Sequence, residues 1–63
     1  MYKLEVIKIN NLWAIKATFH GRIKHRFFHY KKDALSDLPT WQNREDMFFE
    51  REFYHNFEPY DQV

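Results

Sequence analysis

The chain of 63 residues has no cysteine, one glycine, two prolines and a single serine. Without cysteine it can form neither a disulfide framework nor a thiolate zinc site, and it carries no thiol nucleophile. One glycine cannot build a loop that cradles phosphate, and Ser36 has no glycine beside it to shape a nucleophile elbow. These absences exclude the commonest arrangements for nucleophilic catalysis and favour a protein that works by binding.

Long apolar runs are also missing. No segment approaches the ~20 apolar residues of a membrane-spanning helix, and residues 1–5 alternate instead of forming the apolar block of a signal peptide. The lack of cysteine fits a reducing compartment, so we expect a soluble, unprocessed protein of the cytoplasm.

The length of the chain supports one core and no second domain, since about 60% of the unfolded surface is buried at this size. Its 44% hydrophobic and 21% aromatic residues are too many for a disordered protein. We therefore expect a single domain over residues 1–63. A small core without disulfides favours stabilisation by a partner or by a second copy of the chain.

Charges of opposite sign gather in the two halves of the chain. Residues 1–32 contain eight Lys and Arg against one Glu, whereas residues 33–63 contain two Arg against eight Asp and Glu. The formal charges of the halves are therefore +7 and −6, although the whole chain carries +1. This asymmetry indicates either an anion-binding face or two halves that neutralise each other within the fold.

The first two strands are predicted over residues 2–9 and 12–19, where apolar and polar residues alternate. Asn10 and Asn11 lie between them, and asparagine tolerates the positive φ of a two-residue hairpin turn. Such a turn pairs residues in a defined register. The predicted pairs are Tyr2 with Phe19, Leu4 with Ala17, Val6 with Ile15, Lys8 with Trp13 and Glu5 with Lys16.

A third strand is predicted over residues 22–30, after a turn at His20 and Gly21. A three-residue loop there aligns Ile23, His25 and Phe27 with the apolar face of the second strand. A two-residue loop would put Arg22, Lys24 and Arg26 on that face instead. We expect the three-residue loop, because burying unpaired charge is costly.

Two helices are predicted to complete an α+β fold built on a three-stranded antiparallel β-meander. Over residues 31–38, apolar residues have helical spacing, and Pro39 is expected to end the helix. Over residues 43–56 the helical stripe consists of Phe49, Phe53 and Phe57. Parts of this segment also alternate as a strand would, but Asn43 as N-cap favours a helix, with Pro59 after its end.

Histidines and carboxylates do not combine into a catalytic or metal site. On a strand, His25 and His29 would lie roughly 13 Å apart, too far to bind one ion, and no H-E-x-x-H motif is present. Paired carboxylates such as Glu45 and Asp46, or Glu50 and Glu52, are better explained as the solvated face of a helix. We expect no enzymatic activity, no metal and no cofactor.

The predicted registers place the basic residues of the strands, other than Lys8, on the sheet face opposite the core. The candidate binding residues of this basic face are Lys3, Lys16, Arg22, Lys24 and Arg26. The apolar and aromatic candidates are Ile7, Ile9, Phe28 and Tyr30 on the sheet, and Phe48 and Tyr54 in the acidic half. Because Lys and Arg neutralise phosphates and exposed rings stack bases, this face has the elements of a nucleic-acid platform. Alternatively, its apolar residues form a second small core.

Three strands and a helix follow one another over residues 2–38, with the sequence WAI at 13–15 and RFFHYKKDAL at 26–35. This pattern resembles two related DNA-binding families, the plant ethylene-response-factor domains and the arm-site-binding domains of tyrosine recombinases. The resemblance implies that the exposed sheet face lies in the DNA major groove. The positions that match the DNA-reading strands are Lys16, Arg22, Lys24 and Arg26.

The small size and the Lys, Asn, Ile and Phe content also resemble small accessory proteins of bacteriophages, which implies action in the host cytoplasm on a host protein. We therefore expect a non-enzymatic phage or bacterial accessory or regulatory factor that acts by protein–protein interaction. This hypothesis is motivated by five aromatic residues that exceed what one short helix needs to bury, Phe48, Phe49, Phe53, Tyr54 and Phe57. A nucleic-acid-binding module is the alternative, a homodimer is compatible with both, and neither a membrane nor a small-molecule substrate is expected.

Overall fold

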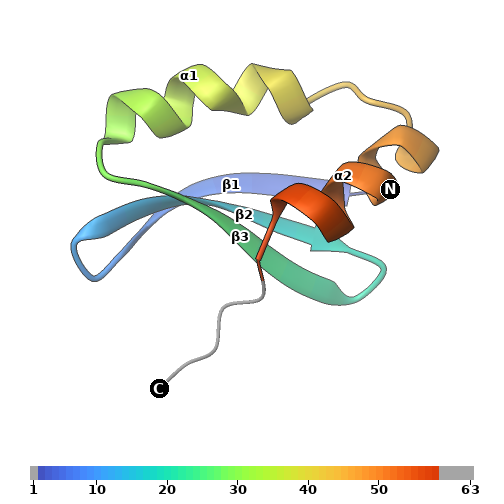
Figure 1. Cartoon of the computed structure of the whole chain (residues 1–63), viewed down its shortest axis with the longest axis horizontal. Helices are drawn as coiled ribbons and strands as arrows, with labels where there is room; N and C mark the ends of the chain where they lie inside the picture. The colour runs from blue at the N-terminus through green and yellow to red at the C-terminus, as the bar shows by residue number, and fades with distance from the viewer. Residues whose placement is uncertain (1, 59–63) are drawn as a thin grey trace.

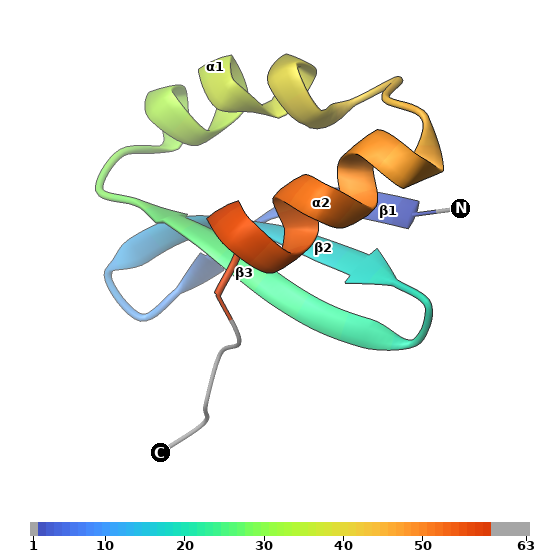
Figure 2. The same cartoon turned by 45° about the vertical axis from the view of Figure 1, so that its right-hand side comes forward.

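The computed structural model describes residues 2–58 and has the α+β architecture that the sequence predicts. Three strands, β1 (Tyr2–Ile9), β2 (Leu12–Phe19) and β3 (Arg22–Phe28), form one antiparallel sheet in the order β1-β2-β3 (Figure 1). Two helices follow, α1 (Lys31–Trp41) and α2 (Asp46–Asn56), and both lie on the same side of the sheet (Figure 1, Figure 2). We call the covered side the helix face and the other side the opposite face.

The β1–β2 hairpin confirms its predicted register. Tyr2 lies across from Phe19, Leu4 from Ala17, Val6 from Ile15, Glu5 from Lys16 and Lys8 from Trp13. Asn10 has a φ of 55°, a left-handed conformation that asparagine adopts more readily than most residues. The turn residue and the alternating pattern thus specify the same pairing.

The predicted register of the β2–β3 hairpin is wrong by one residue. His20 and Gly21 form a two-residue turn in which both have a positive φ, 51° and 77° respectively. The pairing places Arg22 across from Phe19, Lys24 from Ala17 and Arg26 from Ile15. Because a one-residue slip moves every side chain of a strand to the other face, these three basic residues lie on the helix face. Ile23, His25 and Phe27 lie on the opposite face.

Three basic residues are tolerated on the helix face because β3 is an edge strand of the sheet. Arg22 is exposed, while Lys24 and Arg26 are half-buried. Long basic side chains can lay their aliphatic stems along apolar surface and keep their charged ends at the rim. The predicted cost of burying these three charges, which favoured the other register, is therefore largely avoided.

Helix α1 does not end at Pro39 as predicted but continues to Trp41. A proline inside a helix loses one backbone hydrogen bond, so the last turn needs other stabilisation. Trp41 supplies it, because its side chain is buried and its indole Nε1 donates a hydrogen bond to Asp37 Oδ2 at 2.5 Å. At the other end of α1, β3 stops at Phe28 and Tyr30 is already the N-cap residue, so the third strand is shorter than predicted.

The second predicted helix is confirmed as α2, which begins at Asp46 and not at residue 43. Asn43 is not its N-cap, because Asn43 has a φ of 63° and turns the chain between the helices. Glu45 is the N-cap residue, and its carbonyl accepts hydrogen bonds from the N–H groups of Phe48 and Phe49. Pro59 and residues 60–63, for which the sequence predicts the end of this helix and the segment after it, are not among the residues that the structure describes.

Aromatic rings fill much of the core between the sheet and the helices. The predicted stripe of Phe49, Phe53 and Phe57 is buried, and the first two of these rings pack on Phe19 of β2. Tyr2 stacks on Phe49 with ring centroids 3.7 Å apart. Burial of each such ring stabilises the fold by about 1.5–3 kcal/mol. The other buried core residues are Ile15, Ala17, Ala34 and Trp41.

The two outer edges of the sheet differ. On the β3 edge, His25 and Glu58 exchange two backbone hydrogen bonds of 2.7 Å, so the C-terminal segment extends the sheet at this point. On the β1 edge, no strand or bridge pairs with the sheet within residues 2–58.

Candidate functional site

The basic sheet face predicted from the sequence does not form as a single surface. Lys3 and Lys16 lie on the opposite face of the sheet, as predicted. The corrected register moves Arg22, Lys24 and Arg26 to the helix face. The five basic candidates are therefore divided between two sides of the molecule.

Arg26 is held in place by the fold. Its Nε lies 3.0 Å from Asp37 Oδ2, and its Nη1 donates a hydrogen bond of 3.3 Å to the carbonyl oxygen of Asn56. Its guanidinium carbon also lies 5.5 Å from the ring centroid of Trp41. These contacts link β3 to both helices, so Arg26 connects structural elements.

The other two basic residues of β3 lie over rings of α2. Lys24 Nζ is 4.7 Å from the ring centroid of Tyr54 and 5.3 Å from that of Phe53. The guanidinium carbon of Arg22 lies 5.9 Å from the ring centroid of Tyr54. A cation over an aromatic face is attracted by the negative potential of the ring. Two positively charged groups therefore lie close to the ring of Tyr54.

The sheet contributes less apolar surface to a site than predicted. Ile7 and Ile9 lie half-buried on the opposite face, where Ile7 forms a row with Ala14 and Phe27 across the three strands. Phe28 lies on the helix face and packs against the core. Tyr30 is exposed beside α1, with Lys32 Nζ 5.8 Å from its ring centroid. These four candidates do not meet at one place.

Helix α2 is apolar on two sides. Its inner side carries the buried Phe49 and Phe53, whereas its outer side exposes three large apolar residues. Their exposed fractions are 70% for Met47, 57% for Phe48 and 44% for Tyr54. At 100° per residue, Met47, Arg51 and Tyr54 share one helical stripe with Phe48 beside it. We call Met47, Phe48, Arg51 and Tyr54 the α2 patch.

Phe48 and Tyr54 were predicted as binding candidates, and Met47 was missed. A signal for Met47 was present in the sequence, because residues 47, 51 and 54 have the spacing of one helix face and lie opposite the Phe49–Phe53 stripe. The prediction for this helix considered only the Phe49–Phe53–Phe57 stripe and did not examine the opposite face. The start of α2 at Asp46 places Met47 in its first turn.

Chemically, the α2 patch combines soft apolar surface with charges of both signs, since the exposed Glu50 lies one helical turn from both Met47 and Tyr54. Met is flexible and adapts to different partners, and Tyr offers a large ring with a polar end. Arg51 lies within the patch, and Arg22 and Lys24 border it at Tyr54. Such a surface can bury an apolar partner and attract carboxylates at the rim of the contact.

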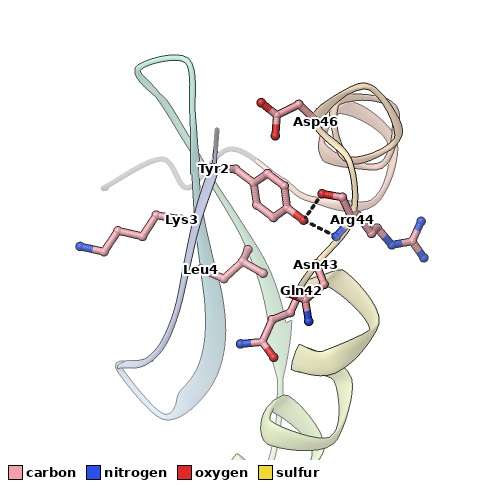
Figure 3. Close-up of a pocket in the computed structure, with 7 residues that line it drawn as sticks. All are labelled: Tyr2, Lys3, Leu4, Gln42, Asn43, Arg44 and Asp46. Atoms are coloured by element: carbon pink, nitrogen blue, oxygen red, sulfur yellow. Dashed lines mark hydrogen bonds between the residues drawn. The ribbon is translucent and has the colours of Figure 1, made fainter.

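A groove lies between the edge of β1 and the segment that joins the helices (Figure 3). It has a volume of about 560 Å³ and is lined by Tyr2, Lys3, Leu4, Gln42, Asn43, Arg44 and Asp46. The hydroxyl of Tyr2 accepts a hydrogen bond of 2.8 Å from the N–H of Arg44 and lies 2.9 Å from the carbonyl oxygen of Trp41. This hydroxyl therefore ties the joining segment to β1.

The middle of the opposite face is polar, with Glu5, Lys16 and His25 in one row across the sheet. His25 is only 5% exposed. Burial lowers the pKa of His25 below its ordinary value of 6.5, and the charge of the neighbouring Lys16 lowers it further. Within residues 2–58, no three His, Asp or Glu side chains lie close enough to hold a metal ion. The same range contains no helix long and apolar enough to cross a bilayer.

Comparison of this chain with protein-family models, with curated proteins and with solved structures finds no match.

Proposed function

We propose that this chain is a small, non-enzymatic accessory protein that acts by binding another protein through the α2 patch. The observation that carries the proposal is the exposure of Met47, Phe48 and Tyr54 together on a helix whose other side is already buried. One apolar side is enough to dock a helix on a sheet. The second apolar side adds nothing to that docking and is typical of a contact surface.

The composition of the α2 patch favours a protein partner. Aromatic residues, Met and Arg are enriched in protein interfaces, and a few residues, most often Trp, Tyr and Arg, supply most of the binding energy. Of the five aromatic residues that motivated this hypothesis, Phe49, Phe53 and Phe57 are used by the core. Phe48 and Tyr54 remain available at the surface.

The charges around the α2 patch indicate the chemistry of the partner. Arg22 and Lys24 lie beside Tyr54, and Arg51 lies between Met47 and Tyr54 on the same stripe. We infer a partner segment with an apolar strip, as on an amphipathic helix, and with a carboxylate that faces the cluster of Arg22, Lys24 and Arg51. The division of the basic residues between two faces favours this partner over a nucleic acid, which would need a continuous positive surface.

The proposal is tested by affinity capture from a lysate of the cells in which the chain is made, with and without nuclease. The patch variant carries Met47→Ser and Phe48→Ser, and the matched control carries Leu35→Ser, which removes an apolar side chain that is also exposed, on α1. We expect captured proteins to be lost with the patch variant and kept with the control, whatever the nuclease treatment. Capture that survives in the patch variant, or that nuclease abolishes, would contradict the proposal.

A further inference from the structure

The outer edge of β1 has the geometry to pair with another strand. In an antiparallel ladder, residues alternate between bonding to one neighbouring strand and to the other. Since Ile9 and Leu12 flank a two-residue turn and pair with each other, the odd residues of β1 bond to β2. The backbone groups of Tyr2, Leu4, Val6 and Lys8 are therefore directed outward.

The other edge of the sheet supports this alternation. Arg22 flanks the second two-residue turn and pairs with Phe19, so the even residues of β3 bond to β2 and the odd ones are directed outward. His25 is such an outward residue, and it exchanges hydrogen bonds with Glu58. Within residues 2–58 the β3 edge is thus partly paired, whereas the β1 edge has no strand partner.

Two copies of β1 can pair only in certain registers. A two-fold axis that relates antiparallel strands stands perpendicular to the sheet, so both copies present the same face on the same side. Residues that lie directly across from each other in the two copies must then both have even numbers or both have odd numbers. The possible centres of symmetry on β1 are therefore single residues, such as Lys3, Leu4, Glu5, Val6 or Ile7.

Charge selects among these centres. An axis at Lys3 or at Glu5 would place that residue across from its own copy, and like charges directly opposed are destabilising. An axis at Val6 or Ile7 would set Glu5 across from an isoleucine and form no ion pair. Only an axis at Leu4 places Lys3 of each copy across from Glu5 of the other, which gives two favourable cross-strand pairs.

The same axis gives apolar pairs on the helix face. Leu4 would lie across from its own copy, and Tyr2 across from Val6 of the second copy. Leu4 and Tyr2 line the groove at this edge, and Leu4 projects from β1 toward the joining segment (Figure 3). The groove thus lies next to the position that the apolar side chains of β1 from the second copy would occupy. A lysine on an edge strand opposes pairing with another strand, but Lys8 lies outside the residues that would pair.

We propose that two copies of this chain associate edge to edge through residues 2–6 of β1, with the two-fold axis at Leu4, to form a continuous six-stranded sheet. Both pairs of helices then lie on one side of that sheet. The proposal concerns a different surface from the α2 patch and does not depend on the proposed function. Because Glu5 also lies across from Lys16 within the chain, each Glu5 would bridge two lysines in the dimer.

The test is sedimentation velocity at micromolar to submillimolar concentration, with two complementary variants. The first carries Lys3→Glu. The second carries Glu5→Lys with Lys16→Glu, which preserves the ion pair between β1 and β2. The matched control, Lys8→Glu, makes the same charge change as the first variant on the same strand but outside the paired residues. Far-UV circular dichroism of each variant shows that it is folded.

We expect the wild type and Lys8→Glu to form dimers. Each complementary variant alone should dissociate at least about tenfold more readily, because two attractive pairs become repulsive. An equimolar mixture of the two should form heterodimers, because every Glu then faces a Lys. A wild type that stays monomeric, or a Lys3→Glu variant that dimerises like the wild type, would overturn the proposal. A mixture that stays monomeric, or a dimer that Phe48→Ser abolishes, would also overturn it.

Discussion

The ammonium nitrogen of Lys24 lies 4.7 Å from the ring centroid of Tyr54, so a basic residue of the edge strand β3 contacts an aromatic residue of α2. This contact depends on the register of β3, since Lys24 would lie on the opposite face if the strand slipped by one residue. It also joins the α2 patch to the sheet. The position of the patch is therefore coupled to the pairing of β2 with β3.

Lys24→Glu is expected to lower the free energy of unfolding by about 1 kcal/mol, because a carboxylate replaces a cation at the negative faces of Phe53 and Tyr54. Lys24→Met keeps the aliphatic stem and should cost less. Urea denaturation of both variants measures the difference. Equal stability of the two variants would contradict the assigned contact.

Substitution of two adjacent phenylalanines of α2 should change the stability of the fold to very different extents. Phe48→Ser, at an exposed position, is expected to change the free energy of unfolding by no more than about 0.5 kcal/mol. Phe49→Ala removes a fully buried ring and should cost about 3–5 kcal/mol, which is enough to unfold much of so small a protein. Thermal unfolding followed by circular dichroism compares them. A large loss of stability in Phe48→Ser would mean that its ring is part of the core.

Asp37 accepts hydrogen bonds from Arg26 and from the buried Trp41, so its two substitutions should differ. Asp37→Asn keeps an acceptor for the indole and loses only a partly exposed ion pair, with an expected cost of up to about 1 kcal/mol. Asp37→Ala also leaves the indole N–H without its acceptor, which adds about 1–3 kcal/mol. Chemical denaturation should therefore rank the wild type first, Asp37→Asn second and Asp37→Ala last. An Asp37→Ala variant at least as stable as Asp37→Asn would show that Trp41 does not need this acceptor.

The pH dependence of stability should reflect His25. Its pKa is lowered in the folded state by burial and by Lys16, so below about pH 6.5 the unfolded chain binds more protons than the folded chain. The contribution of His25 to the free energy of unfolding is therefore fully present above pH 6.5. It is lost as the pH decreases toward the lowered pKa. Urea denaturation across this range should show the loss in the wild type and a smaller one in His25→Gln. An identical pH dependence in the two proteins would refute this assignment.

The first hairpin and the helical stripe of α2 could be predicted because local features agree there. In β1 and β2 the alternation and the Asn10 turn specify one register, and in α2 the buried Phe residues have a single helical period. Both features depend on residues close together in the sequence. They were therefore visible without knowledge of the tertiary contacts.

The register of β3 could not be predicted, because both of its faces carry mixed residues. The partners of its basic side chains are Asp37, Phe53 and Tyr54, which follow β3 in the sequence and approach it only in the folded chain. A local pattern shows Arg22, Lys24 and Arg26 as charges without partners, and it therefore favours the wrong face. This error created the single basic face on which the nucleic-acid hypothesis was built.

The end of α1 and the start of α2 were missed for a related reason. Trp41 stabilises a helical turn after Pro39 through burial and through Asp37, a benefit that proline's local preference does not reveal. Asn43 has the side chain of an N-cap but the backbone of a left-handed turn, since the chain must reverse between the helices. Met47 lies on the exposed face of α2 because of its spacing from Arg51 and Tyr54, which does not depend on where the helix begins.

Photo-crosslinking tests the binding function of α2 most directly. The full chain is made with p-benzoylphenylalanine in place of Phe48 on the α2 patch or, as a matched control, in place of Leu35 on α1, and is irradiated in its own cells. We predict a discrete adduct with a protein from position 48 and none from position 35. Adducts of equal yield from both positions, or an adduct with nucleic acid alone at position 48, would contradict the assignment of the α2 patch as a protein-binding surface.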